Sequence, residues 1–88
     1  MKKCIVITSP DQYDMDMRTG EIKLNVREMH LDDVRVGDEV EVIFLDDDIT
    51  NTYKVKEKQI DMQSTVSYGE AVPIFVMEFL HSGGESDL

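Results

Sequence analysis

The feature that most limits how this chain can fold is the stretch YDMDMRTGEIKLNV, residues 13–26, where apolar and charged residues alternate around Thr19 and Gly20. Alternation with a period of two is typical of a β-strand with one buried face. A two-residue hairpin loop needs positive φ, which glycine adopts at little steric cost. Folding the stretch about Thr19 and Gly20 places apolar residues opposite one another: Met17 and Ile22, Met15 and Leu24, Tyr13 and Val26.

The other face of this predicted hairpin pairs unlike charges, with Arg18 opposite Glu21 and Asp16 opposite Lys23. Such cross-strand pairs each contribute roughly 0.2–1 kcal/mol and so favour this register. A shift of one residue would move the apolar side chains into water. We therefore interpret the charges here, those of Asp14 and Asp16 included, as residues that fix strand register rather than as a binding site.

Further strands are expected before and after this hairpin. The run KCIVIT, residues 3–8, is continuously apolar in its middle, which predicts a strand buried on both faces. A second hairpin is expected over residues 39–58 with its loop at 47–50, so that Phe44 lies opposite Tyr53. In the same register Val42 faces Val55, Glu41 faces Lys56 and Glu39 faces Lys58.

The remaining segments suggest turns and one more strand. Residues 29–39 predict a single helical turn and a tight corner at Gly37. The phrase LDDVRVGDEVEV resembles the corner and strand of many small β-barrels, a likeness of fold that implies no function. Residues 59–68 extend the preceding strand or form a short one. The run AVPIFVMEFL predicts a central or wrapped strand, with Pro73 confined to its start, an edge or a bulge.

These elements predict an all-β fold, a small antiparallel barrel or sandwich of five to six strands built from hairpins, with minimal helix. A chain of 88 residues is long enough for one domain with a modest core. We expect a single β domain over residues 1–81 and a flexible C-terminal tail over residues 82–88.

The sequence predicts a cytoplasmic protein. No apolar run approaches the roughly 18 residues that a membrane-spanning helix needs. The apolar part of MKKCIVITSPDQ is also too short for the core of a signal peptide. The single cysteine, Cys4, lies within an apolar strand and is expected to be a small buried hydrophobic residue rather than a nucleophile.

The net charge of −10 is concentrated in one part of the chain. Residues 1–31 are neutral overall, whereas residues 32–48, the acidic segment, contain Arg35 and eight acidic residues. Those eight are the candidate partner-binding residues: Asp32, Asp33, Asp38, Glu39, Glu41, Asp46, Asp47 and Asp48. Surplus acid can simply keep a small protein soluble. It can also dock onto a basic surface, where complementary charge speeds encounter and makes binding sensitive to salt.

We therefore expect a non-enzymatic interaction domain whose acidic segment binds a basic surface of a partner protein. A nucleic-acid-binding protein is such a partner, and the domain would then inhibit it by mimicking DNA or RNA. The alternative is a structural or assembly domain that associates through its edge strands or an apolar face. Direct nucleic-acid binding is not expected, because the chain lacks a basic stripe and an aromatic ladder. Membrane binding is not expected either, and the oligomeric state stays open.

Other groups of residues give only weak indications of a metal site or of catalysis. Asp46, Asp48, Thr50 and Glu57 match positions of a calcium loop, but Asn51 replaces its required glycine and the flanks alternate as strands do. Weak cation binding by residues 46–57 stays open. His30, His81 and Cys4 are too scattered for a zinc motif. Without a nucleophile elbow or a phosphate-binding glycine loop, we expect no catalytic residues, no cofactor and no metal.

Overall fold

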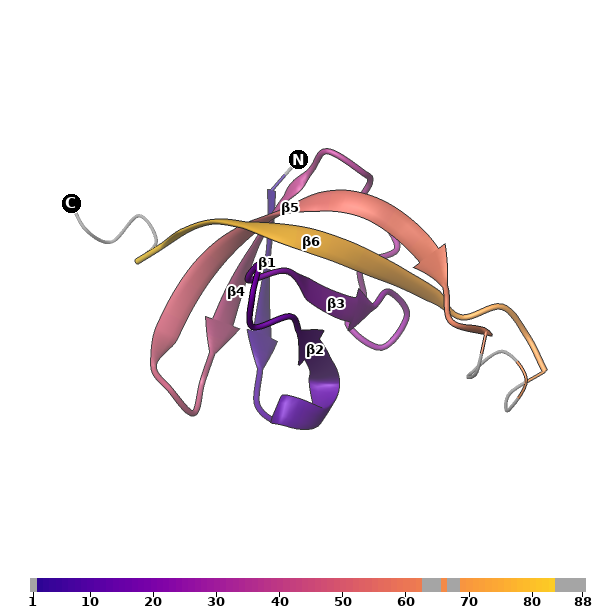
Figure 1. The fold of residues 1–88 in the computed structure, drawn as a ribbon, viewed down its shortest axis with the longest axis horizontal. Coiled ribbons are helices and arrows are strands. Elements are labelled where there is room, and N and C mark those ends of the chain that lie inside the picture. Colours follow the sequence, from indigo (N-terminus) through magenta and orange to yellow (C-terminus); the bar gives the residue numbers. More distant parts are fainter. Residues whose placement is uncertain (1, 63–65, 67–68, 84–88) are drawn as a thin grey trace.

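The computed structural model describes residues 2–62, 66 and 69–83 of the chain. All six strands belong to one sheet, in the order β1-β4-β5-β6-β3-β2 (Figure 1). The predicted all-β fold is thus confirmed, in the form of a curled sheet that makes a half-barrel. The elements are β1 Lys2–Ile7, the 3-10 turn η1 Pro10–Gln12, β2 Tyr13–Met15, β3 Ile22–Asn25, β4 Glu39–Phe44, β5 Ile49–Ile60 and β6 Pro73–Ser82.

The curl follows from the order of the strands. β1 and β2 are consecutive in the chain but lie at opposite edges of the sheet, so residues 8–12 must connect the two edges. That link spans at most roughly 20 Å even when extended, and η1 shortens it further. The edges of a flat six-stranded sheet would lie roughly 24 Å apart. The sheet therefore curves, with β1 parallel to β4 and the other neighbouring strands antiparallel.

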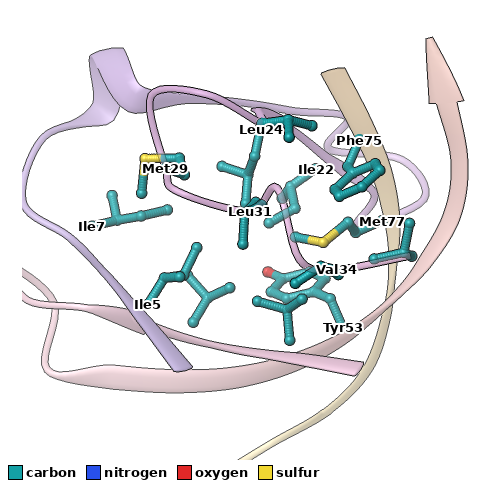
Figure 2. Close-up of a cluster of buried hydrophobic side chains, with 14 of the residues drawn as sticks. Ile5, Ile7, Ile22, Leu24, Met29, Leu31, Val34, Tyr53, Phe75 and Met77 are labelled. Atoms are coloured by element: carbon teal, nitrogen blue, oxygen red, sulfur yellow. The ribbon is translucent and has the colours of Figure 1, made fainter. Parts of the chain in front are cut away.

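The core fills the inner face of this curled sheet. Figure 2 shows strand residues such as Ile22 and Tyr53 around Leu31, which lies in the middle of the labelled side chains. Leu31 comes from the irregular segment 26–38, which contributes its buried apolar side chains to this core. Those residues are Val26, Met29, Leu31 and Val34. This segment is therefore part of the core although it contains no strand.

The first hairpin forms, but its predicted register is wrong by two residues. Tyr13 lies opposite Leu24 and Met15 opposite Ile22. The loop is longer than the predicted Thr19-Gly20 pair because Asp16 N–H donates to the Glu21 carbonyl at 2.9 Å and closes a loop over residues 17–20. As a result Met17 lies in the loop and is 85 % exposed, while Met15, on the edge strand β2, is 38 % exposed.

The second hairpin differs from its prediction by four residues. Phe44 lies opposite Ile49 and Val40 opposite Tyr53, so the loop covers residues 45–48 rather than 47–50. Asp48 closes that loop with a left-handed backbone, φ 55°. The predicted pairing of Glu41 with Lys56 is wrong, because Lys56 Nζ instead donates to Glu21 Oε2 at 2.7 Å.

β1 is buried on one face only, contrary to the prediction. Ile5 and Ile7 are in the core, whereas Val6 is 45 % exposed and Cys4 is also exposed. β1 is an edge strand, and its outer face carries no second layer of secondary structure in the part of the chain that the structure describes. The prediction that Cys4 is a buried hydrophobic residue was therefore wrong.

The later segments agree better with expectation. β6 is central, between β5 and β3, and it begins at Pro73 as predicted. Within the segment 59–68, Gln59 and Ile60 extend β5, whereas residues 63–65 and 67–68 lie outside the described residues. Of the predicted tail, Ser82 ends β6 and the Gly83 N–H donates to the Thr50 carbonyl at 2.8 Å. Residues 84–88 also lie outside the described part.

The segment before β4 forms successive turns instead of the predicted helical turn. Val34 N–H donates to the Leu31 carbonyl and Asp38 N–H to the Arg35 carbonyl, each at 3.0 Å. Gly37 adopts a positive φ of 98° at the predicted corner. The corner was thus placed correctly, although its neighbours are not helical.

Candidate interaction surface

The structure divides the eight residues predicted in the acidic segment among three places. One group precedes β4, two residues lie on β4, and one group occupies the turn between β4 and β5. At about 3.3 Å per residue the ends of β4 are roughly 17 Å apart, so the acidic segment makes two separate terminal groups rather than one patch. The groups are Asp32, Asp33 and Asp38; Glu39 and Glu41; and Asp46, Asp47 and Asp48.

Two carboxylates of the first group have partners within the protein. Lys3 Nζ donates to Asp33 Oδ1 at 2.9 Å and to the His30 carbonyl at 2.7 Å, which ties the turn to β1. The hydrogen bond from Lys3 lowers the pKa of Asp33 below its ordinary value. Asp38 Oδ2 accepts from the Arg35 N–H at 3.0 Å, and this bond lowers the pKa of Asp38. These carboxylates therefore have structural roles, which weakens their candidacy as partner-binding residues.

The two glutamates lie on the outer face of β4. Glu39 is exposed and lies opposite Lys54 of β5. Glu41 is half-buried, with Cys4 of β1 on one side and Thr52 of β5 on the other. The pairing with Lys54 places a positive charge beside Glu39. The neighbours of Glu41 on β1 and β5 restrict access to its carboxylate.

The third group, the turn Asp46–Asp48, is the most accessible. All three residues are exposed. The backbone of the turn is fixed, because Asp47 N–H donates to the Phe44 carbonyl at 3.2 Å and Leu45 N–H to the Ile7 carbonyl at 3.0 Å. Among the described side chains, none of the ion pairs includes these aspartates; those pairs are Lys3–Asp33, Arg18–Asp16, Arg27–Glu70 and Lys56–Glu21.

A small pocket lies directly beside this turn. Its volume is about 140 Å³, and it is lined by Ile7, Ser9, Pro10, Tyr13, Phe44, Asp46 and Asp47. The rings of Tyr13 and Phe44 meet edge to face, with centroids 5.2 Å apart and planes at 67°. The pocket thus combines an aromatic wall with two of the predicted site residues.

Sequence reasoning did not find this pocket, because its walls come from β1, the link, β2 and β4 and meet only when the sheet curls. One local signal was present. Ser9 and Gln12 have the spacing of a capping box, in which each side chain accepts from the backbone N–H at the other end. That motif builds η1, which carries Pro10, one of the lining residues of the pocket.

The other constellations gain no support as sites. β5 begins at Ile49, so Thr50 and Glu57 of the calcium-loop match lie on an extended strand that carries Glu57 away from Asp46 and Asp48. Within residues 2–62, 66 and 69–83, no group of three or more His, Cys, Asp and Glu residues could hold a metal ion. His30 and His81 are exposed, the first in the irregular segment 26–38 and the second on β6.

A larger hollow of about 430 Å³ lies at the end of β3, between Asn25, Arg27, Glu28, Glu70 and Val72. Arg27 and Glu70 face each other across it, with Nη1 and Oε2 3.1 Å apart. Arg27 and Glu70 compensate each other's charge, which leaves the carboxylate of Glu28 as the uncompensated charge among these lining residues.

No protein-family model, curated protein or solved structure significantly matches the chain. Among the described residues, no helix combines the length and the apolar character required to cross a membrane. Function must therefore be inferred from the surface itself.

Proposed function

We propose that this protein is a non-enzymatic cytoplasmic interaction domain that binds a basic surface of a partner protein through the turn Asp46–Asp48. The observation that supports this most is the accessibility of three consecutive aspartates that take part in none of the described ion pairs. Such a group attracts a basic surface over a Debye length of about 8–10 Å at ordinary ionic strength. The net charge of −10 adds to the rate of encounter.

The partner that this chemistry fits best is a nucleic-acid-binding protein. Such proteins neutralise phosphates with Lys and Arg, so their binding channels are strongly basic. Carboxylates held on a fixed turn can occupy positions that phosphates otherwise take. Binding of the domain in such a channel would exclude nucleic acid, and the domain would then act as an inhibitor.

A salt-dependent capture experiment tests the proposal. The protein is immobilised and exposed to lysate at low and high salt, and retained proteins are identified by mass spectrometry. The test variant carries Asp46→Asn, Asp47→Asn and Asp48→Asn. We expect wild type, but not this variant, to retain a basic nucleic-acid-binding protein at low salt. The attraction between exposed charges is screened at high salt, and the substitutions remove the charges themselves. Duplex DNA added to the lysate should compete for the same protein.

A control variant changes the net charge equally but elsewhere. It carries Glu28→Gln, Glu57→Gln and Glu78→Gln, three exposed residues outside the acidic segment. This control should retain the partner nearly as wild type does. Equal retention of one partner by wild type and the triple aspartate variant would contradict the proposal, and so would equal loss from both variants.

A second candidate function is an assembly domain that associates through an edge strand or an apolar face. The observation in its favour is that β1 lies at a sheet edge and that several large apolar side chains are exposed on β1 and near the ends of β4, β5 and β6. These are Val6, Leu45, Ile49, Phe79 and Leu80. Light scattering at low and high salt tests it: a salt-insensitive oligomer supports assembly, and a monomer at both salt concentrations contradicts it.

A further inference from the structure

Two features meet in the pocket beside the turn Asp46–Asp48. One is the aromatic wall made by Tyr13 and Phe44, with Ile7 and Pro10 as further apolar lining. The other is the pair of carboxylates of Asp46 and Asp47. No Lys or Arg is among the lining residues, so the pocket itself contains no counter-charge.

The walls of this pocket are held in place before anything binds. Gln12 Oε1 accepts from the Thr8 N–H at 2.7 Å and the Ser9 N–H at 3.0 Å, which fixes the link that carries Pro10. On the opposite side, the hydrogen bond from Leu45 N–H to the Ile7 carbonyl, 3.0 Å long, fastens the acidic turn to the end of β1. A preformed site loses less entropy on binding than one that must be ordered first.

We propose that this pocket receives one arginine side chain of the partner, an inference that rests on the proposed function and makes its contact specific. A volume of about 140 Å³ is close to the roughly 150 Å³ of a cavity that holds one benzene molecule, so one side-chain head group fits. The guanidinium group is planar and stacks on an aromatic ring, while its N–H groups pair with a carboxylate as a fork. An ammonium group is a compact, strongly hydrated charge that offers neither geometry.

The turn provides a matched control for this inference. Asp46 and Asp47 line the pocket, whereas Asp48 belongs to the same turn but does not line it. Asp48→Asn removes the same charge, and asparagine tolerates the positive φ at this position. The control for the ring is Tyr13→Phe, which keeps the aromatic ring that Tyr13→Leu removes from the wall.

Two-dimensional NMR of the labelled protein measures binding of N-acetylarginine amide, with the uncharged isostere N-acetylcitrulline amide and N-acetyllysine amide as comparison probes. We expect saturable shifts of the backbone amides around Tyr13 and Asp46 with the arginine probe. Binding should weaken about ten-fold in Asp46→Asn and in Tyr13→Leu, because each loses one of the two paired interactions. Tyr13→Phe should bind as wild type does, and Asp48→Asn should lose about two-fold or less. The spectra also report whether each variant is folded.

The inference is overturned if the arginine probe shows no saturable shifts, if citrulline or lysine binds as tightly, or if Asp48→Asn weakens binding as much as Asp46→Asn does. Failure of the pocket and failure of the proposed function are distinguishable by the capture experiment with single variants. If all three single aspartate variants lose the partner equally, the acidic turn still binds the partner as proposed, and only the arginine pocket is overturned. Undiminished capture by the triple variant overturns the proposed function instead.

Discussion

At the scale of single residues, Lys3 makes a contact whose dependence on pH can be predicted. Its ammonium group donates to Asp33 and to the His30 carbonyl, and the bond to Asp33 holds the pKa of that carboxyl below its ordinary value. A carboxyl whose pKa is lower in the folded state stabilises the fold above its unfolded pKa, and this contribution is lost as the pH falls through the lowered value.

We therefore expect Asp33→Asn to flatten the loss of stability in acid. The difference between wild type and variant in urea unfolding should be present at neutral pH and should shrink in acid, as the pH falls from the ordinary pKa of an aspartate toward the lowered pKa of Asp33. Urea midpoints measured across that range provide the check. A difference that stays constant with pH would show that the contact between Lys3 and Asp33 is not electrostatic in origin.

At the scale of elements, the alternating pattern predicted both hairpins but could not fix their registers. Side chains alternate with a period of two, so registers that differ by two or four residues bury the same face and are equally consistent with the pattern. Loop geometry makes the choice, through the hydrogen bond between Asp16 and Glu21 and through the left-handed backbone of Asp48. Residue propensities indicate the left-handed conformation of Asp48 only weakly, because asparagine and glycine favour that conformation more than aspartate does.

The segment 26–38 shows a second limit of pattern reasoning, since its buried residues follow no strand or helix period. We expect Leu31→Ala, at a side chain that is 0 % exposed, to lower the free energy of unfolding by about 2–5 kcal/mol. Val36→Ala in the same segment removes a side chain that is 57 % exposed and should change it by no more than about 0.5 kcal/mol. Chemical denaturation compares the two, and similar losses would mean that this segment does not complete the core.

At the scale of the whole molecule, charge and exposure could be predicted for the acidic turn, but the pocket beside it could not. The turn's aspartates are contiguous in sequence, whereas Tyr13 meets Phe44 only because residues 8–12 connect the two edges of the sheet. Such a contact depends on the path of the chain through space, which local periodicity does not contain.

Lengthening that link should loosen both edges together. A Gly-Ser-Gly-Ser insertion after Thr8 relieves the short connection between β1 and β2, so we expect faster amide hydrogen exchange in both edge strands while β5 and β6 stay protected. The same insertion after Arg18, in the exposed loop between β2 and β3, is the control and should leave β1 unchanged. Slower or unaltered exchange in β1 and β2 would mean that the link does not hold the edges.

The parallel pairing of β1 with β4 also sets an order of events in folding. β4 and β5 are joined by a four-residue turn and can pair soon after they meet, whereas Lys2 must find Glu39 across the intervening chain. Pairings between distant residues form slowly because a long loop must close, with a loss of chain entropy, before any stabilising contact forms. The β1 edge of the half-barrel is thus expected to form last. The pocket, which depends on Ile7, would be able to bind a ligand only after this final step of folding.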